Sequence, residues 1–462
     1  MNVLLISPKW KSAYSSLNIF LPPLGLMYIA GMLRQNGHNV RIIDENIEPI
    51  DYDEFKEYDL VGISSDTCRY PEAVSLAKEA KKRGKIVVMG GFHTTFLDDD
   101  AIKTGFVDCV VRGEGEEIMV QIAEALEDGR TFNDIPAITY KEKSKIVRNP
   151  GIGIVENIDK LPYPARDLIK IDQYPTTVAG KKATSVLTSR GCPFNCSFCA
   201  VTKFSGIKWR ARSAKSIVDE IQTILKKGWA KAIVFVDDNF TLSVKRVKEI
   251  CRLIKERALK FPWWCMSRVD TLVKNPDMVE EMASAGCKTV FLGLESGNED
   301  TLEDFNKKIS TTISEKAVNL LRKFGITPYG SFIIGALGET KESILKTIEF
   351  SKKLKLGISQ FSILTPFPGT DLFNSIKERI VERDWSKFDA LHLVFKHDKL
   401  SRKQVHKLLV KAYASFYSQP RIIFRFFKDI LKGNFKFLSG LKIFFRFLKA
   451  GIIRLFYPSK ID

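Results

Sequence analysis

The sequence lacks the signatures of several common protein classes. No GxGxxG follows the first predicted strand and no P-loop sequence occurs, which argues against the usual dinucleotide and nucleoside triphosphate sites. No basic, apolar and small-residue pattern of a secretory signal opens the chain, so we expect a cytoplasmic protein with reduced thiols. The formal charge is +18, but no nucleic-acid reading module accompanies it, and we expect no nucleic-acid partner.

Cysteines are few and unevenly placed. Three of the eight, Cys192, Cys196 and Cys199, lie within eight residues, directly after a β-branched run at 184–189. No further Cys or His follows until Cys251, whereas a zinc site usually brings a second ligand pair at short range. Three thiolates on one tight loop suit three corners of an iron–sulfur cube and leave the fourth iron open for a reactant. The spacing therefore favours a metal-cluster loop over a chance grouping of buried thiols.

Residues 1–130 alternate predicted strands with predicted helices. This rhythm is typical of a doubly wound α/β domain, in which glycine-rich loops at the carboxyl ends of parallel strands form a ligand crevice. Helices are expected from Pro22 to about Gly37 and at 71–83. The five expected strands are Val3–Ser7, Val40–Asp44, Leu60–Ser64, Ile86–Gly91 and Val107–Val111.

From residue 184 onward a strand-then-helix pattern recurs. Six such units predict a partial (β/α)6 barrel with its chemistry at the carboxyl ends of the strands. Residues 131–180 read as a linker, because the prolines in Leu161-Pro-Tyr-Pro favour extended backbone and stop helices. The expected strands are 184–189, 232–236, 263–267, 288–294, 328–335 and 358–364, and the expected helices lie near 213–227, 243–259, 276–286, 311–324 and 341–354.

The carboxyl-terminal segment is basic and aromatic. Residues 420–460 carry ten Lys or Arg against one acid, Asp429, spaced every three or four residues among Phe, Leu and Ile. This pattern puts cations on one helical face and aromatics on another, and no stretch reaches the about 18 charge-free apolar residues of a spanning helix. It favours an interfacial helix on an anionic membrane surface. A helical hairpin packed on the barrel is the alternative.

The cysteine loop carries a family resemblance. The run from Thr188 to Cys199, TSRGCPFNCSFC, resembles the CxxxCxxC signature of the radical S-adenosylmethionine (SAM) superfamily, with an aromatic residue before the last Cys. The resemblance implies that the three Cys bind a 4Fe–4S cluster and that SAM chelates the open iron through its amino and carboxylate groups. An electron from a reductant such as flavodoxin or ferredoxin then cleaves SAM to methionine and a 5'-deoxyadenosyl radical. Phe198 is expected near the adenine.

The same resemblance places SAM contacts at the ends of later strands. Carboxylate and amide oxygens after the second barrel strand suit the ammonium of SAM, and an arginine after the third suits its carboxylate. A glutamate after the fourth suits the ribose hydroxyls or the amine, and a glycine ends the strand on the adenine side. Each could instead be an ordinary strand-end cap or a surface charge. The expected SAM residues are Phe198, Asp237, Asp238, Asn239, Arg268, Glu295 and Gly335.

The amino-terminal segment resembles the cobalamin-binding domain that precedes many radical SAM cores. The resemblance is carried by Pro22–Leu26, Val87–Phe96 and Val111–Glu116. The chain lacks the DxHxxG sequence of cobalamin mutases, so that motif nominates no histidine as the lower cobalt ligand. Glycines at strand ends allow close backbone approach to a bulky ring. The expected cobalamin contacts are Gly90, Gly91, His93 and Gly113.

The predicted organisation follows from these segments. Residues 1–132 are expected to form a cobalamin-binding-like Rossmann domain, 133–180 a linker, 181–395 the radical SAM core and 396–462 a helical, basic and aromatic tail.

The predicted function is methylation of an unactivated carbon of a lipid-like or tetrapyrrole substrate, peripherally at the inner face of the membrane. The resemblance is to the group containing the anaerobic magnesium-protoporphyrin ester cyclase and hopanoid-biosynthesis enzymes. Cyclisation or rearrangement without methyl transfer is one alternative. An iron–sulfur or corrinoid-dependent sensor is another, although electron transfer predicts a fully ligated cluster and only three cysteines are grouped.

Overall fold

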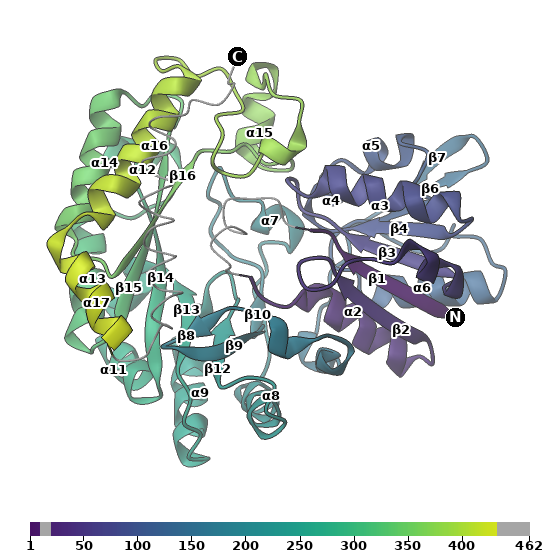
Figure 1. The fold of residues 1–462 in the computed structure, drawn as a ribbon, viewed down its shortest axis with the longest axis horizontal. Helices are drawn as coiled ribbons and strands as arrows, with labels where there is room; N and C mark the ends of the chain where they lie inside the picture. Colours follow the sequence, from purple (N-terminus) through teal and green to yellow (C-terminus); the bar gives the residue numbers. More distant parts are fainter. Residues whose placement is uncertain (10–19, 432–462) are drawn as a thin grey trace.

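The computed structural model describes residues 1–9 and 20–431, which form two seven-stranded sheets with helices packed on them (Figure 1). The first sheet has the order β2-β1-β3-β4-β5-β6-β7, with β1 to β5 parallel and the last two strands antiparallel. The order 2-1-3-4-5 is that of a doubly wound fold whose ligand crevice lies where the order reverses, between β1 and β3. The doubly wound prediction is confirmed. The strands are β1 (Asn2–Ser7), β2 (Asn39–Asp44), β3 (Leu60–Ser64), β4 (Ile86–Gly90), β5 (Cys109–Val111), β6 (Ile138–Glu142) and β7 (Lys145–Arg148).

Alternating side chains of β1 explain why helices cover both faces of this sheet. Val3 and Leu5 pack into one hydrophobic cluster with α2 (Leu24–Gln35) and α6 (Glu116–Glu127). Leu4 and Ile6 pack into a second cluster with α3 (Tyr70–Lys82) and α5 (Asp98–Lys103). A short helix, α4 (Phe92–Phe96), follows β4 directly.

The first sheet extends into the segment that was expected to be a linker. Strands β6 and β7 form a hairpin that pairs antiparallel with β5. Its turn includes Lys143 at φ 54°, a conformation usually given to glycine or asparagine, so the sequence carries no ordinary turn signal there. Beyond the hairpin, residues 149–176 contain short 3₁₀ turns and an isolated bridge residue, Gly153, but no longer helix or strand.

The second sheet is curled and has the order β16-β15-β14-β13-β12-β9-β8. Its strands from β9 to β16 are parallel and β8 is antiparallel, which confirms the partial barrel. The strands are β8 (Thr177–Val178), β9 (Lys181–Val186), β12 (Ala232–Phe235), β13 (Trp263–Ser267), β14 (Cys287–Glu295), β15 (Thr327–Ile334) and β16 (Ile358–Ile363). The helices are α8 (Ala214–Lys226), α9 (Val244–Glu256), α10 (Val269–Lys274), α11 (Pro276–Ser284), α12 (Glu299–Asp304), α13 (Thr311–Lys323), α14 (Lys341–Lys353), α15 (Asp371–Ser375) and α16 (Arg402–Tyr417).

Helix α8 shows how the barrel helices form. Ser213 caps its amino end by accepting a hydrogen bond from the backbone N–H of Ser216. Ile217, Ile221 and Ile224 recur on one helical face and are fully buried in the barrel core. Burying such a side chain contributes about 1.5–3 kcal/mol each.

The two sheets meet near their carboxyl edges. Phe92, just beyond β4, stacks on Phe204 of α7 (Val201–Phe204) with ring centroids 4.1 Å apart. Trp385, from the segment beyond β16, packs against the core of the barrel and also against that of the first sheet. Figure 1 shows α7 lying between the two sheets.

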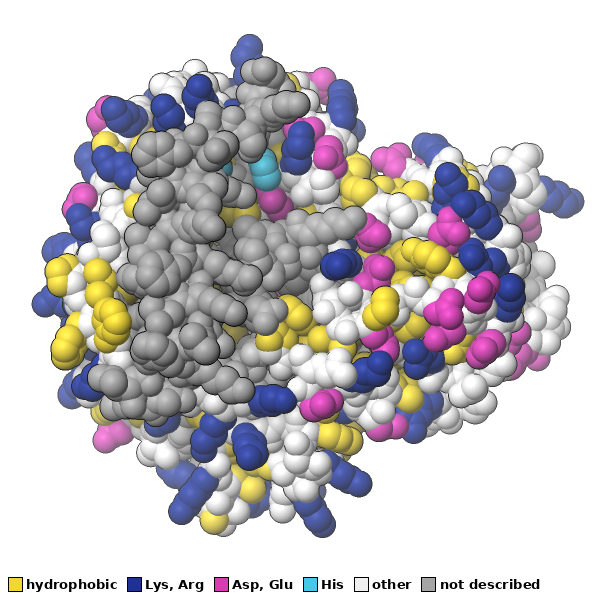
Figure 2. Space-filling view, viewed as in Figure 1, with side chains coloured by type: hydrophobic (Ala, Val, Ile, Leu, Met, Phe, Trp, Pro, Cys, Tyr) yellow, Lys and Arg dark blue, Asp and Glu magenta, His cyan; other side chains and the backbone are white. Residues whose placement is uncertain are grey.

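The last described helix, α17 (Pro420–Leu431), packs on the barrel with its cationic side. Arg421 donates a hydrogen bond to the Leu356 carbonyl at 2.7 Å, and Arg425 donates one to the Thr327 hydroxyl at 3.0 Å. Phe424 is 71% exposed and Phe427 is 46% exposed. Figure 2 shows hydrophobic side chains at the left edge of the molecule, where Figure 1 places α17. Thus these two cations face the protein, while the aromatics reach the surface.

The rest of the predicted membrane tail, residues 432–462, lies outside the described residues. In the part of the chain that the structure describes, no helix combines the length and apolarity needed to cross a bilayer.

Candidate functional site

The three grouped cysteines lie on the loop between β10 (Ser189–Arg190) and α7, which follows β9 at the carboxyl edge of the barrel. Cys196 is buried and the other two are half-buried. Burial raises the pKa of Cys192, and it raises that of Cys199 to about 12. Such thiols become ligands by exchanging the proton for a bound metal. Among residues 1–9 and 20–431, no three Cys, His, Asp or Glu side chains are grouped closely enough to hold a single metal ion.

The cysteine loop is docked on the segment that follows α12. The backbone N–H of Ser197 donates to the Phe305 carbonyl at 3.2 Å, and the Asn306 side chain donates to the Asn195 carbonyl at 2.7 Å. The rings of Phe198 and Phe305 meet edge to face with centroids 5.1 Å apart. These contacts fix the loop before any cofactor binds, and they place Phe198 at the mouth of the barrel.

Asp237 holds the strand that leads into the cysteine loop. Its carboxylate accepts hydrogen bonds from the Thr188 N–H at 2.7 Å and from the Ser189 hydroxyl at 2.5 Å. The Thr188 hydroxyl donates to it as well, and Arg246 lies 3.5 Å away. The side chain is fully buried. In this arrangement Asp237 is occupied by the protein itself, which the sequence did not reveal.

Asp238 and Asn239, the next two residues, face the site differently. The Asp238 side chain is reached by solvent but is surrounded by protein, and burial together with the charge of Asp237 raises its pKa to about 6. Its charge in turn raises the pKa values of Cys192 and Cys199, so it lies near the loop. Asn239 is buried with its side-chain N–H group unpartnered among the described residues. A buried donor without a partner suits a ligand.

Arg268, at the end of β13, stacks on the cysteine loop. Its guanidinium carbon lies 3.8 Å from the centre of the Phe194 ring, a cation–π contact. It also donates to the Asp270 carboxylate and to the Lys307 carbonyl, each at 3.1 Å. The guanidinium is thus held at the predicted edge, with Asp270 already pairing it.

Glu295 ends β14 and forms a buried ion pair with Lys307, which sequence reasoning missed. The Lys307 ammonium lies 2.6 Å from Glu295 and 6.0 Å from the centre of the Phe198 ring. Burial alone lowers the pKa of Lys307, but the charges of Glu295 and Cys196 raise it above its ordinary value. Nothing in the local run Asn306-Lys-Lys distinguishes this lysine, because its partners are assembled only by the fold.

Gly335 begins a turn after β15 that is held from both sides. Its φ is 78°, and the N–H groups of Gly335 and Ala336 donate to Glu339 at 2.7 and 3.0 Å. His397 binds the Ala336 carbonyl at 2.7 Å. Burial raises the pKa of Glu339 to about 7. Neither Glu339 nor His397 was foreseen, although Glu339 closes the Gly335-Ala-Leu-Gly-Glu run.

The edge of the first sheet contains the other predicted contacts. Gly91 has φ 104°, and a Cβ there would lie 2.4 Å from the Ser65 carbonyl oxygen, so only glycine fits. Gly90 has room for a Cβ. His93 is fully buried between Tyr70 and Trp385, with ring centroids 4.1 and 4.8 Å away, and neither ring nitrogen has a partner among the described residues. Burial lowers its pKa to about 3, so His93 is neutral and enclosed.

Gly113 allows two segments of the backbone to approach each other and does not line the crevice. It forms an isolated β-bridge with Gly153, and a Cβ at Gly113 would lie 2.5 Å from the Gly153 carbonyl oxygen. Its φ of 86° is in the left-handed region. The glycine therefore lets the segment after the hairpin approach the end of β5, a role that its sequence context did not show.

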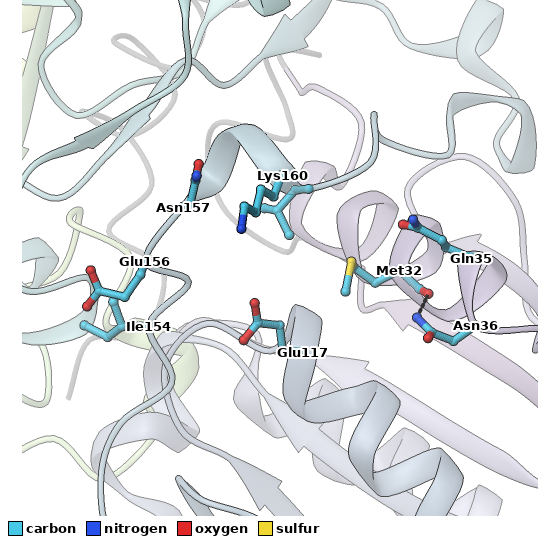
Figure 3. A pocket seen from close by; sticks show the side chains of 9 residues that line it. Met32, Gln35, Asn36, Glu117, Ile154, Glu156, Asn157 and Lys160 are labelled. Carbon is cyan, nitrogen blue, oxygen red and sulfur yellow. Dashed lines mark hydrogen bonds between the residues drawn. The ribbon is translucent and has the colours of Figure 1, made fainter.

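Two cavities lie near the first sheet. One, of about 280 Å³, opens where the strand order reverses and is lined by Ser7, Ser64 and Arg69. It coincides with the crevice expected of this fold. The other, of about 620 Å³, lies between α2, α6 and residues 154–161, and none of the predicted site residues lines it. Figure 3 shows Glu117 and Lys160 pointing into the same space there.

Comparisons with known proteins agree with this geometry. Residues 186–351 match the radical SAM superfamily, and residues 14–123 match the B12 binding domain. The chain is 37% identical to an uncharacterized methyltransferase of Pyrococcus horikoshii over 99% of each protein. It is 28% identical to the anaerobic magnesium-protoporphyrin IX monomethyl ester cyclase of Rubrivivax gelatinosus, over 99% of this chain and 84% of the cyclase. The structure of the cobalamin-dependent SAM radical enzyme OxsB with aqua-cobalamin bound matches with a TM-score of 0.75 at 16% identity, over 96% of this chain and 72% of that chain, which shows the fold.

A three-cysteine loop on an open barrel, beside a doubly wound sheet with a crevice, is the arrangement expected of a cofactor-dependent enzyme with two ligand-binding domains. The chain belongs to the radical SAM superfamily and carries a B12 binding domain. It is a radical SAM enzyme of the methyltransferase or cyclase kind, and its cofactors are a 4Fe–4S cluster, SAM and cobalamin.

Proposed function

We propose that this enzyme transfers a methyl group to an unactivated carbon of a tetrapyrrole or lipid-like substrate. One observation carries the proposal: the cysteine loop and the carboxyl edge of the first sheet are brought together, since Phe204 beyond the loop stacks on Phe92 beyond β4. A radical source and a methyl carrier must both reach one substrate carbon, and this juxtaposition supplies that requirement. The 37% identical relative is named a methyltransferase.

The chain's own residues have assignable roles. Bound at the two edges, the cluster with SAM supplies the radical and cobalamin supplies the methyl group. With SAM bound, Asp238 would accept a hydrogen bond from its amino group, and the unpartnered side-chain N–H group of Asn239 would donate to its carboxylate. Phe198 and the turn at Gly335 would contact the adenosyl group. Arg268 and Lys307 contact the aromatic rings of the loop while Asp270 and Glu295 balance their charges.

The residues at the edge of the first sheet also have separate roles. The cavity lined by Ser7, Ser64 and Arg69, of about 280 Å³, and the carboxyl edge beside it are where this domain would hold cobalamin. Gly91 keeps β3 and β4 close enough to present a flat edge to that ring. His93 is enclosed, so we assign it to packing under Trp385 rather than to cobalt.

A radical cyclisation is the second candidate, since the chain matches a magnesium-protoporphyrin ester cyclase along its length. SAM carrying a deuterated methyl group separates the two. The reconstituted enzyme is given this SAM with magnesium-protoporphyrin monomethyl ester or with a membrane lipid extract, and products are analysed by mass spectrometry. A product carrying the labelled methyl group supports methyl transfer and identifies the substrate class. A product that has lost hydrogen and gained no label contradicts methyl transfer and supports cyclisation.

The exposed aromatics of α17 support a position on an anionic membrane surface, where a lipid-like or tetrapyrrole substrate accumulates. Replacing Phe424 and Phe427 by Ser removes apolar surface without touching Arg421 or Arg425, which bind the barrel. Flotation with anionic vesicles is expected to show loss of binding in this variant. An Ile207→Ser variant, which changes another exposed apolar residue, is the matched control and keeps binding. Equal flotation of all three proteins would contradict membrane docking by α17.

A further inference from the structure

Four buried charged residues join the segment after β5 to the two-stranded ribbon that flanks the cysteine loop. Arg190, two residues before Cys192, lies 2.5 Å from Glu116 and 3.2 Å from Glu114. Arg210 donates to both carboxylate oxygens of Glu114, at 2.7 and 2.8 Å. We call this set, Glu114, Glu116, Arg190 and Arg210, the charge lock. Its partners are 74 to 96 residues apart in sequence.

The arginine side of the lock is rigid. Arg190 and Arg210 are directly paired residues of an antiparallel ribbon formed by β10 and β11 (Arg210–Ala211). The cysteine loop and α7 are the connection between the two strands of this ribbon. A displacement of either arginine therefore moves the base of the cysteine loop.

The glutamate side is equally fixed. Glu114 also accepts a hydrogen bond from the Val155 N–H at 2.8 Å, beside the bridge between Gly113 and Gly153. Glu116 is the first residue of α6, where a negative charge is favoured by the helix dipole. The lock is thus anchored to β5, the strand next to β4 and its crevice loops.

The four charged residues of the lock form ion pairs with one another. All four side chains are buried, and two positive charges balance two negative ones. Burial raises the pKa of Glu114, but hydrogen bonds from Arg210 and the charge of Arg190 lower it below its ordinary value overall. Removing one member leaves an uncompensated buried charge, which is far costlier than removing a surface pair.

We propose that the charge lock sets the position of the cysteine loop relative to the carboxyl edge of the first sheet, where cobalamin is proposed to bind. Its four members are then positioning residues for methyl transfer. This inference rests on the proposed function for its catalytic meaning. Its structural content, a mechanical link from the end of β5 to the cysteine loop, holds in the protein without cofactors. On this proposal, the run Val111-Arg-Gly-Glu-Gly-Glu joins the first domain to the barrel rather than contacting a cofactor.

The test uses the full chain and a matched control. Glu116→Gln keeps a hydrogen-bond acceptor for Arg190, and Arg190→Lys keeps the positive charge. Each variant therefore weakens the ion pairs of the lock without leaving a cavity. Asp219→Asn is the control, because Asp219 is a half-buried carboxylate on α8 that pairs at 2.6 Å with Arg257, just after α9, and no hydrogen bond of either side chain reaches the cysteine loop.

The first measurement is amide hydrogen exchange in the protein without cofactors. Weakening a charge-assisted hydrogen bond across the lock is expected to speed exchange in residues 186–199 by roughly tenfold in both lock variants. The control speeds exchange around Arg257 and leaves 186–199 at the wild-type rate. Wild-type exchange at 186–199 in both lock variants, or equal acceleration in the control, would overturn the proposal.

The second measurement is the magnetic interaction between the reduced cluster and cob(II)alamin, recorded by electron paramagnetic resonance after reconstitution. The lock variants are expected to keep their iron and corrinoid content and to show a weakened or broadened interaction, while the control matches the wild type. An unchanged interaction in both lock variants overturns the positioning role. Failure of the wild type to bind corrinoid contradicts the proposed function instead, and the exchange result still decides the mechanical link.

Discussion

The carboxyl edges of the two sheets are built by different means. At the barrel edge, acidic side chains are paired by the protein itself, as Asp237 is with Thr188 and Glu295 with Lys307. At the edge of the first sheet, backbone shape dominates, with Gly91 against Ser65 and a cavity at the strand reversal. A small charged ligand requires a preorganised set of charges, whereas a large flat one requires a clear surface. The difference is the one expected if SAM binds at the barrel edge and cobalamin at the other edge, as proposed above.

The largest expected effect comes from the cysteine loop. Cys196→Ala removes one cluster corner, so SAM cleavage falls below detection while the first sheet still binds corrinoid. Cys251→Ala, a change of a thiol fully buried in the barrel core, keeps the cluster and is the control. Iron content and 5'-deoxyadenosine are measured by spectroscopy and chromatography. If Cys196→Ala still cleaved SAM, the proposal that SAM binds at the barrel edge would be contradicted.

A backbone change at the other edge has the complementary effect. Gly91→Ala introduces a Cβ 2.4 Å from the Ser65 oxygen at a positive φ, and we expect lost corrinoid binding with the cluster intact. Gly84→Ala also has a positive φ but meets open space, so it costs only the about 1 kcal/mol of backbone strain and keeps corrinoid binding. Corrinoid absorbance after gel filtration separates them. Equal binding by both variants would show that the shape of this edge is unimportant.

Lys307 tests the electrostatic side of the comparison. Lys307→Met removes a positive charge near Cys196 and leaves Glu295 unpaired, so the cluster is expected to be harder to reduce, by roughly 40 mV for each ~1 kcal/mol of lost attraction. Lys307→Arg keeps the charge and serves as the control. Redox titration followed by electron paramagnetic resonance measures the midpoint. An unchanged midpoint in Lys307→Met would make this ion pair purely structural.

The smallest effect is a pH dependence at Glu339. Burial raises its pKa from 4.5 to about 7, so the folded protein holds a proton that the unfolded chain releases between these values. The contribution of Glu339 to stability is therefore full below about pH 4.5 and falls by about 1.4 kcal/mol per pH unit up to about pH 7. Urea unfolding at pH 5 and pH 8 measures the free energy of unfolding. The value for Glu339→Gln relative to the wild type should be higher at pH 8 than at pH 5. Glu342→Gln, an exposed change nearby, shows no such gain, and a constant difference for Glu339→Gln would refute the burial argument.

Much of the fold could be predicted because its strands are continuous apolar runs. The expected runs at 232–236 and 263–267 correspond to β12 and β13 to within one residue. The β6–β7 hairpin was missed because Lys143 occupies a turn position normally marked by glycine or asparagine. Local pattern was therefore sufficient wherever burial alone decided the structure.

The site was predictable only where its chemistry is local. The cysteine spacing is contained in eight residues, so the cluster loop could be recognised directly. The roles of Asp237, Lys307 and Arg190 depend on partners 48, 12 and 74 residues away. No periodicity or propensity encodes such ion pairs, because the fold alone brings their members together.

One measurement tests the assignment of the two edges most directly. The protein is reconstituted anaerobically with iron, sulfide and hydroxocobalamin, and then treated with SAM and dithionite while corrinoid absorbance is recorded. We predict one corrinoid bound per chain together with production of 5'-deoxyadenosine. SAM cleavage without bound corrinoid would contradict the assignment of the first sheet, and bound corrinoid without any SAM turnover would contradict that of the barrel.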